Sequence, residues 1–291
     1  MREVLAVDVG GTKLAAALVG DDGAVRGRRS VPTPGERPWD ALSALIGEVL
    51  DAATTDAGGP VACGVGCGGP MLRGGATVSP LNIPAWRGFP LRDRVAERTG
   101  LPTYVDNDAK ALALGEGWKG AAVGQSDYIA MVVSTGVGGG IVLDGRLLDG
   151  AGGNAGHIGH VIVEPGGALC ACGARGCLEA VASGLAIERA TGRSAKDADA
   201  ETRTRTGRLV GRAIADVANL LDLGLAVVGG SVALGFGVMF FDAAQEEIDE
   251  CARIEFAAGC RVVPAGLGDA GPLVGAAAVA WRARRGDGAL P

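Results

Sequence analysis

Both histidines and three of the seven cysteines fall within residues 157–177, "HIGHVIVEPGGALCACGARGC". Imidazole nitrogens and thiolates are the ligands that proteins offer to zinc, and paired thiols also form disulfides in oxidising compartments. The stretch is therefore a disulfide framework, a metal site or part of an active site, and its residue types alone do not decide among these three interpretations.

A second candidate for chemistry is the pair Asn107-Asp108 in "VDNDAKALALGE", where a short strand runs into a helix. Asn and Asp commonly cap helices at such junctions. A further carboxylate, Asp8, ends the first apolar strand, where it could hold a hydrated Mg²⁺.

Three glycine-rich turns follow apolar strands. Without a Cβ, such a turn can bring backbone N–H groups onto phosphate oxygens. The first turn adds Thr12 and Lys13, a hydroxyl and an ammonium suited to an anion. One turn alone is more often a simple hairpin, but three in one chain indicate a nucleotide site; they lie at 10–12, 134–140 and 229–231.

Composition narrows the class of protein. The chain has 291 residues, enough for one large domain or two ordinary ones, and a net charge of −6 with scattered basic residues, which argues against a nucleic-acid surface. Only 4% of residues are aromatic, so Ala, Val and Leu must build the core. No signal peptide is evident, and the uncharged residues 223–241 fit a strand, a turn and a helix better than a membrane span. We therefore expect a cytoplasmic protein with reduced thiols, which disfavours the disulfides.

The elements that must position these residues show a repeat. "EVLAVDVGGTKLAAALVGDDGAV" and "YIAMVVSTGVGGGIVLDGRLL" are each a strand, a glycine turn and a strand that ends in a tight turn. After the His/Cys stretch we expect a polar segment at 191–207, a helix to about Asp222, a strand, one long helix, a strand and a final helix from about Pro272. This order predicts an α/β protein with two related lobes, a boundary near 117–124 and a ligand cleft between the lobes.

The motifs "DVGGTK", "STGVGGG" and "DND", together with the His/Cys stretch, resemble the ROK family of bacterial sugar kinases, which includes glucokinases. The resemblance covers nearly the whole chain, including "GGS" at 229–231 and "AGPLVGAAAVA" at 270–280. It implies a duplicated ribonuclease-H/actin-like ATPase fold that passes the γ-phosphate of ATP to a sugar hydroxyl. Residues 1–117 would form a small lobe on which a helix at about 272–291 packs back, and 118–271 a large lobe with a zinc-binding loop.

The same resemblance assigns the nucleotide site, with ATP and Mg²⁺ as cofactors. Phosphates would meet Gly10, Gly11, Thr12 and Lys13 of the small lobe, beside Asp8, and Thr135 and Gly136 of the large lobe. The adenosine would lie near Gly229, Gly230 and Ser231. The turns are not a Walker A site, because no G-x-x-x-x-G-K-[ST] occurs.

For the sugar, the resemblance makes Asp108 the base that takes the proton of the attacking hydroxyl, while Asn107 binds a neighbouring hydroxyl. Asn82, in "PLNIP", would also reach the sugar. Lys110 departs from the family pattern, which has a small polar residue there. It lies two positions from Asp108 on a helix and should therefore point elsewhere.

For the His/Cys stretch, the resemblance implies a structural Zn²⁺ bound by Cys170, Cys172, Cys177 and His160. Four protein ligands leave no open position, so the ion would shape a sugar-binding loop rather than do chemistry. In the family the ligating histidine also touches the sugar, as does a glutamate that corresponds to Glu179.

His157 stands where the family has a glutamate that binds two adjacent sugar hydroxyls. It could compete as a zinc ligand, although His160 matches the family in register with the cysteines. A neutral imidazole has one donor and one acceptor nitrogen and cannot replace a carboxylate. The donor could instead favour an acylamino, keto or differently oriented oxygen group, so we expect that glucose is not the best substrate.

The leading hypothesis is an ATP-dependent, glucokinase-like hexose kinase. Alternatives are a kinase for another sugar, amino sugar or cyclitol, and a non-catalytic sugar-sensing protein, which Asp108 and a phosphate strand beginning at residue 3 disfavour. We expect a small-molecule sugar as the partner, no nucleic acid or membrane, and a homo-oligomer, either a dimer or a tetramer. Polyphosphate as the donor stays open.

Overall fold

The computed structural model describes residues 2–53 and 58–286, which fold into two compact units. Unit 1 comprises residues 1–123, 146–155 and 267–291, and unit 2 comprises 124–145 and 156–266. Segment 146–155 is thus a short excursion of the chain into unit 1. The predicted lobe ranges did not include this excursion.

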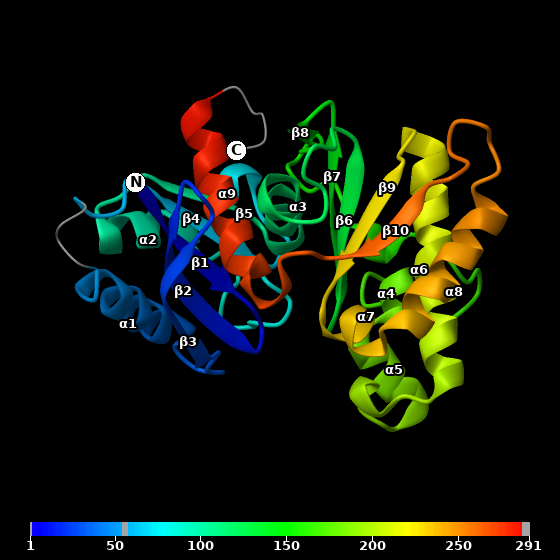
Figure 1. Ribbon diagram of the computed structural model, residues 1–291. Coiled ribbons are helices and arrows are strands. Elements are labelled where there is room, and N and C mark those ends of the chain that lie inside the picture. Colours follow the sequence, from blue (N-terminus) through cyan, green and yellow to red (C-terminus); the bar gives the residue numbers. More distant parts are fainter. Residues whose placement is uncertain (1, 54–57, 287–291) are drawn as a thin grey trace. The chain divides into compact units, whose positions relative to one another are not determined.

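Unit 1 is built on a five-stranded sheet with the order β3-β2-β1-β4-β5 (Figure 1). The first three strands form an antiparallel meander, and β4 and β5 run parallel to β1. The strands are β1 (Glu3–Val9), β2 (Lys13–Gly20), β3 (Val25–Pro32), β4 (Cys63–Cys67) and β5 (Thr103–Asn107). The helices are α1 (Pro38–Asp51), α2 (Leu91–Thr99), α3 (Asp108–Lys119) and α9 (Gly271–Arg285), with a 3-10 turn η2 (Arg73–Gly75).

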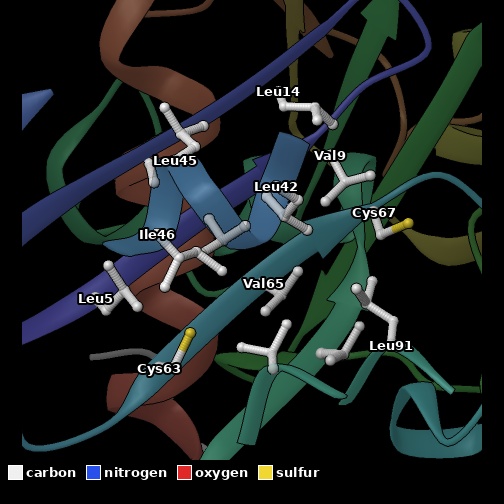
Figure 2. Close-up of a cluster of buried hydrophobic side chains, with 14 of the residues drawn as sticks. Leu5, Val9, Leu14, Leu42, Leu45, Ile46, Cys63, Val65, Cys67 and Leu91 are labelled. Carbon is white, nitrogen blue, oxygen red and sulfur yellow. The ribbon is translucent and has the colours of Figure 1, made fainter. Parts of the chain in front are cut away.

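The two faces of this sheet have separate apolar cores because successive side chains of a strand point to opposite sides. Leu5 and Val65 pack with Leu42, Leu45 and Ile46 of α1, the cluster that Figure 2 shows. Those three α1 residues recur at the spacing of one helix face.

The opposite face of the sheet packs on α9, which contacts β1, β4 and α3. The approach is very close: a Cβ placed on Gly64 would lie 1.9 Å from the carbonyl oxygen of Ala276. A Cβ on Gly275 would likewise lie 2.5 Å from the carbonyl oxygen of Ala111. Glycine at these positions lets the helix lie directly on the strand and on α3.

Unit 2 has a second five-stranded sheet, with the order β10-β9-β6-β7-β8. Its strands are β6 (Tyr128–Val133), β7 (Val137–Leu143), β8 (Arg146–Leu147), β9 (Leu225–Gly229) and β10 (Arg261–Pro264), and the two residues of β8 are counted with unit 1. Helices α6 (Ala200–Leu221) and α8 (Val238–Cys251) pack on each other. The helices are α4 (Leu178–Ala182), α5 (Gly184–Thr191), α6 (Ala200–Leu221), α7 (Ser231–Phe236) and α8 (Val238–Cys251), with 3-10 turns η3 (Ile158–His160) and η4 (Ala195–Asp197).

The two sheets repeat one design. In each, a central strand has an antiparallel hairpin partner on one side and a parallel strand on the other: β1 lies between β2 and β4, and β6 between β7 and β9. The complete orders correspond strand for strand, 3-2-1-4-5 to 8-7-6-9-10. The prediction of a duplicated α/β fold is confirmed.

Two expectations within unit 2 were wrong. The predicted single long helix after β9 is two helices, α7 and α8, because Gly237 adopts φ 61° and breaks the run. The polar segment expected at 191–207 already contains the start of α6, since Asp199 caps it by accepting the N–H of Thr202. Among residues 2–53 and 58–286, no helix combines the length and apolar character needed to cross a membrane.

Candidate active site and metal centre

The carboxyl ends of three parallel strands bring the candidate residues of unit 1 together. Val9 of β1 pairs with Cys67 of β4, which pairs with Asn107 of β5. Asp8 and Asp108 therefore lie at the same edge of the sheet, which is where α/β proteins commonly bind ligands.

The electrostatics of Asp8 reflect this arrangement. Burial raises its pKa to about 7, the Asp108 carboxylate adds to the rise, and Lys13 and Arg28 oppose it. A partly buried carboxylate with its pKa raised in this way is stabilised in its ionised form by a nearby cation, which suits a metal-binding role. Arg28 was not among the predicted site residues, because no motif includes it.

Asn107 and Asp108 divide two tasks between them. The Asn107 side chain caps α3 by accepting the N–H of Ala109 at 3.0 Å and of Lys110 at 3.4 Å. Asp108 is the first residue of the helix and is exposed, with Oδ1 accepting the N–H of Ala109 at 2.9 Å. The cap that the sequence suggested for the pair is thus provided by Asn107.

The first glycine turn and the "PLNIP" segment meet in the fold. A Cβ on Gly11 would lie 2.4 Å from the Cβ of Asn82, so the exposed Asn82 packs directly on the turn. Thr12 and Lys13 of this turn are also exposed. The structure thus places Asn82, the turn and the two carboxylates together in unit 1.

In unit 2 the other two glycine turns also meet. The hydroxyls of Ser134 and Ser231 lie 2.9 Å apart. Gly230 has φ 97°, and a Cβ there would lie 2.4 Å from the carbonyl oxygen of Val133, so only glycine fits.

A cavity of about 520 Å³ lies in unit 1 and one of about 300 Å³ in unit 2. The unit 2 cavity is lined by Thr135 and Ser231 of the predicted site, and by Glu188, Lys196 and Phe236, which carry no motif and were missed. The unit 1 cavity contains none of the predicted site residues.

The cysteine stretch forms a compact cluster in unit 2. Within the described residues all seven cysteines are free. His160 Nδ1 lies 3.7 Å from Cys170 Sγ, and Cys172 Sγ lies 3.7 Å from Cys177 Sγ. The ligand atoms of these four residues all lie within 4.8 Å of one another. Tetrahedral zinc with bonds of about 2.3 Å separates its sulfur ligands by about 3.8 Å, so the four residues fit zinc.

The local backbone explains how the thiols converge. The N–H of Cys170 bonds the carbonyl of Ala174, and the N–H of Gly173 bonds that of Cys170. Gly173 has φ 94°, a conformation that favours glycine. We call this tight turn, residues 170–174, the cysteine knuckle.

His157 and Glu179 lie beside this cluster in the chain. His157 is exposed and its ring stacks on His160 with 6.2 Å between centroids, and it is outside the four-ligand group. Glu179 Oε2 accepts the N–H of Val137 at 3.0 Å, next to Gly136 of the second glycine turn. Glu179 therefore supports that turn in addition to any contact with a ligand.

The family is decided by comparison with known proteins. The model of the ROK family matches residues 4–283. The chain belongs to the ROK family. The family prediction made from the motifs is therefore confirmed.

Individual ROK proteins add detail. The N-acetylmannosamine kinase of Citrobacter koseri is 40% identical over 252 residues, which are 81% of this chain and 85% of that relative. A ROK glucokinase from Streptomyces griseus, solved with glucose and AMPPNP, matches with TM-score 0.82 and 32% identity over 94% of this chain and 98% of that one. A ROK hexokinase from Thermus thermophilus matches with TM-score 0.81 and 34% identity over 98% and 99%.

Proposed function

We propose that this protein transfers the γ-phosphoryl group of ATP to a hydroxyl of N-acetylmannosamine. The chain is an ATP-dependent sugar kinase, like the N-acetylmannosamine kinase and the glucokinase to which it is similar. The identity of the sugar is the new element of the proposal. It rests on one observation, the exposed His157 in place of the family glutamate.

His157 suits an acylamino sugar for a chemical reason. An ionised glutamate accepts hydrogen bonds from two hydroxyls, whereas a neutral imidazole donates through one nitrogen and accepts through the other. The acetamido group of N-acetylmannosamine offers a carbonyl acceptor to that donor. The name of the Citrobacter relative supports the same choice.

We assign the chemistry to Asp108. Its exposed carboxylate takes the proton of the sugar hydroxyl as the hydroxyl oxygen bonds to the γ-phosphorus and ADP leaves. Asn107, whose position is fixed by its capping bonds, would bind a neighbouring hydroxyl. Phosphoryl transfer depends mainly on positioning and charge neutralisation, so a single base with oriented donors is sufficient.

The glycine turns of each unit carry groups suited to the phosphate donor. Lys13 and the backbone N–H groups of the first turn would bind phosphates, and Thr135 and Ser231 line the cavity that suits the nucleoside side. Asp8 would hold Mg²⁺, which when bound neutralises phosphate charge. Polyphosphate is tested beside ATP as a second donor.

The four-residue cluster is proposed as a structural Zn²⁺ site. With three thiolates and one imidazole the coordination is complete, so no position is open for substrate. Its contribution would be to fold the loop between His157 and Glu179, both proposed sugar ligands.

The test is kcat/KM for N-acetylmannosamine, N-acetylglucosamine and glucose, with ATP and with polyphosphate, for wild type and His157→Glu. We expect N-acetylmannosamine and ATP to be the best pair for wild type. A charge-assisted hydrogen bond is worth about 1.5–3 kcal/mol, so His157→Glu should improve glucose use by roughly 10- to 100-fold. Wild type that prefers glucose, or a glutamate variant that gains nothing on glucose, would refute the assignment.

A further inference from the structure

Lys110 is a lysine whose side chain is only 2% exposed, in the first turn of α3. Its ammonium lies 3.0 Å from Asp106 Oδ1 and 2.8 Å from Asp149 Oδ1. It also donates to the carbonyl oxygen of Gly153 at 3.2 Å. A lysine ammonium has three donors, and here each has an acceptor.

Two further charges complete the group. Arg282 of α9 lies 3.5 Å from Asp149 Oδ2 and 4.0 Å from Asp106 Oδ2. Two cations thus face two carboxylates, all within unit 1. Burial raises the pKa of Asp106 and Lys110 opposes that rise, so removing Lys110 would leave a buried carboxylate without its nearest cation.

One end of this group holds the strand-to-helix junction of the base. Asp106 precedes Asp108 by two residues and Lys110 follows it by two, so their ion pair bridges the junction. Asp106 Oδ1 also accepts the N–H of Asn107 at 2.8 Å. The direction of Asn107 and Asp108 therefore depends on this pair.

The other end holds segment 146–155. Besides Lys110, Arg73 anchors the segment by donating to the carbonyls of Gly150 at 3.0 Å and Ala151 at 3.1 Å. The amide of Asn154 donates to the carbonyl of Met71 at 3.2 Å. The chain leaves this anchored segment at Ala155 and reaches His157 two residues later.

We infer that Lys110 is a positioning residue for sugar recognition. One buried ammonium fixes both the junction that presents Asn107 and Asp108 and the segment from which the His157 loop departs. The inference rests on the proposed function of those three residues. It also gives a role to the residue at which the chain departs from the family pattern.

The first experiment compares Lys110→Met with Lys119→Met, the same change at an exposed position at the other end of α3. Misplacing groups around a reacting centre lowers the rate by up to about 100-fold. We therefore expect Lys110→Met to raise the sugar KM and to lower kcat, so that kcat/KM for the sugar falls by roughly 10- to 100-fold. The KM for ATP should change by less than about 2-fold, and Lys119→Met should behave as wild type. A wild-type sugar KM, or equal losses for sugar and ATP, would overturn the inference.

The second experiment uses Asp149→Asn, which retains the junction pair and, being partly exposed, does not depend on survival of a buried charge. Asp149→Asn should raise the sugar KM without changing kcat. In the double variant of Lys110→Met and Asp149→Asn, kcat/KM should fall by less than the product of the two single losses, because both changes remove the same Lys110–Asp149 interaction. Additive losses would contradict the inference. If wild type prefers another sugar, the series is measured on that sugar, so the proposed substrate can fail while Lys110 is still tested.

Discussion

Two carboxylates of unit 1 occupy very different environments. Asp8 is partly buried, with a pKa raised to about 7, whereas Asp108 is exposed at the start of α3. A bound cation would stabilise the ionised form of the partly buried Asp8, whereas the exposed Asp108 is accessible to a substrate hydroxyl. This contrast matches the separate roles proposed for them.

A pH dependence follows for the metal-free protein. Asp8 has a higher pKa in the folded chain than in the unfolded one, so the folded state binds the proton more tightly. Its contribution to stability is complete below about pH 4 and is lost as the pH rises to about 7. In EDTA, we expect the free energy of unfolding of Asp8→Asn, taken relative to that of wild type, to rise by more than about 1 kcal/mol between about pH 5 and pH 8. Urea unfolding at both pH values measures this, and a constant difference would contradict it.

Asp108→Asn should separate catalysis from folding. Because Asn107 provides the cap, we expect the free energy of unfolding to change by less than about 0.5 kcal/mol. Loss of the proton acceptor should lower kcat by about 10²- to 10⁴-fold. Asp93→Asn, in the first turn of α2, is a control that should keep full activity. Near-normal kcat in Asp108→Asn would exclude it as the base.

At the scale of single residues, the sequence identified groups with recognisable motifs. The turn residues follow β1, β6 and β9, Asn107-Asp108 lies where β5 meets α3, and the three cysteines lie close together. Lys196 and Arg28 were missed because a lone surface cation has no local signature. Asp149, one partner of Lys110, was missed for a different reason, because it is thirty-nine residues away in the chain.

Among the elements, the cysteine knuckle is a short segment whose folding should depend on a bound ion. We expect one zinc per chain, and Cys172→Ser should release it, lower the melting temperature and raise the sugar KM. Cys251→Ser, at an exposed cysteine outside the cluster, should retain the ion. Elemental analysis of both proteins decides, and purified wild type without zinc would refute the site.

The elements show where sequence patterns succeed. Strands with continuous apolar runs were predicted closely, because local patterning determines them. The break at Gly237 was missed, since a glycine within an apolar helical pattern does not reveal its own φ. The start of α6 was missed because its first turns are polar and its apolar face begins later.

At the scale of the whole molecule, the duplicated sheets were predictable because the strand-turn-strand pattern occurs twice. The excursion of segment 146–155 into unit 1 was not. Its tethers to Lys110, Arg73 and Met71 are tertiary contacts between distant residues. No periodicity in ten residues indicates such partners.

The position of α9 against β1 has a consequence for synthesis. The strand is made first, and the helix that covers one of its faces follows about 260 residues later. At about 5–20 residues per second, a nascent chain would carry that apolar face uncovered for roughly 15 to 50 s. During this interval the face is a natural target for a ribosome-associated chaperone. A chain that stops at Ala270 should therefore be cleaved by protease within residues 2–53, while its knuckle still binds zinc; equal resistance of the truncated and full-length chains would refute this.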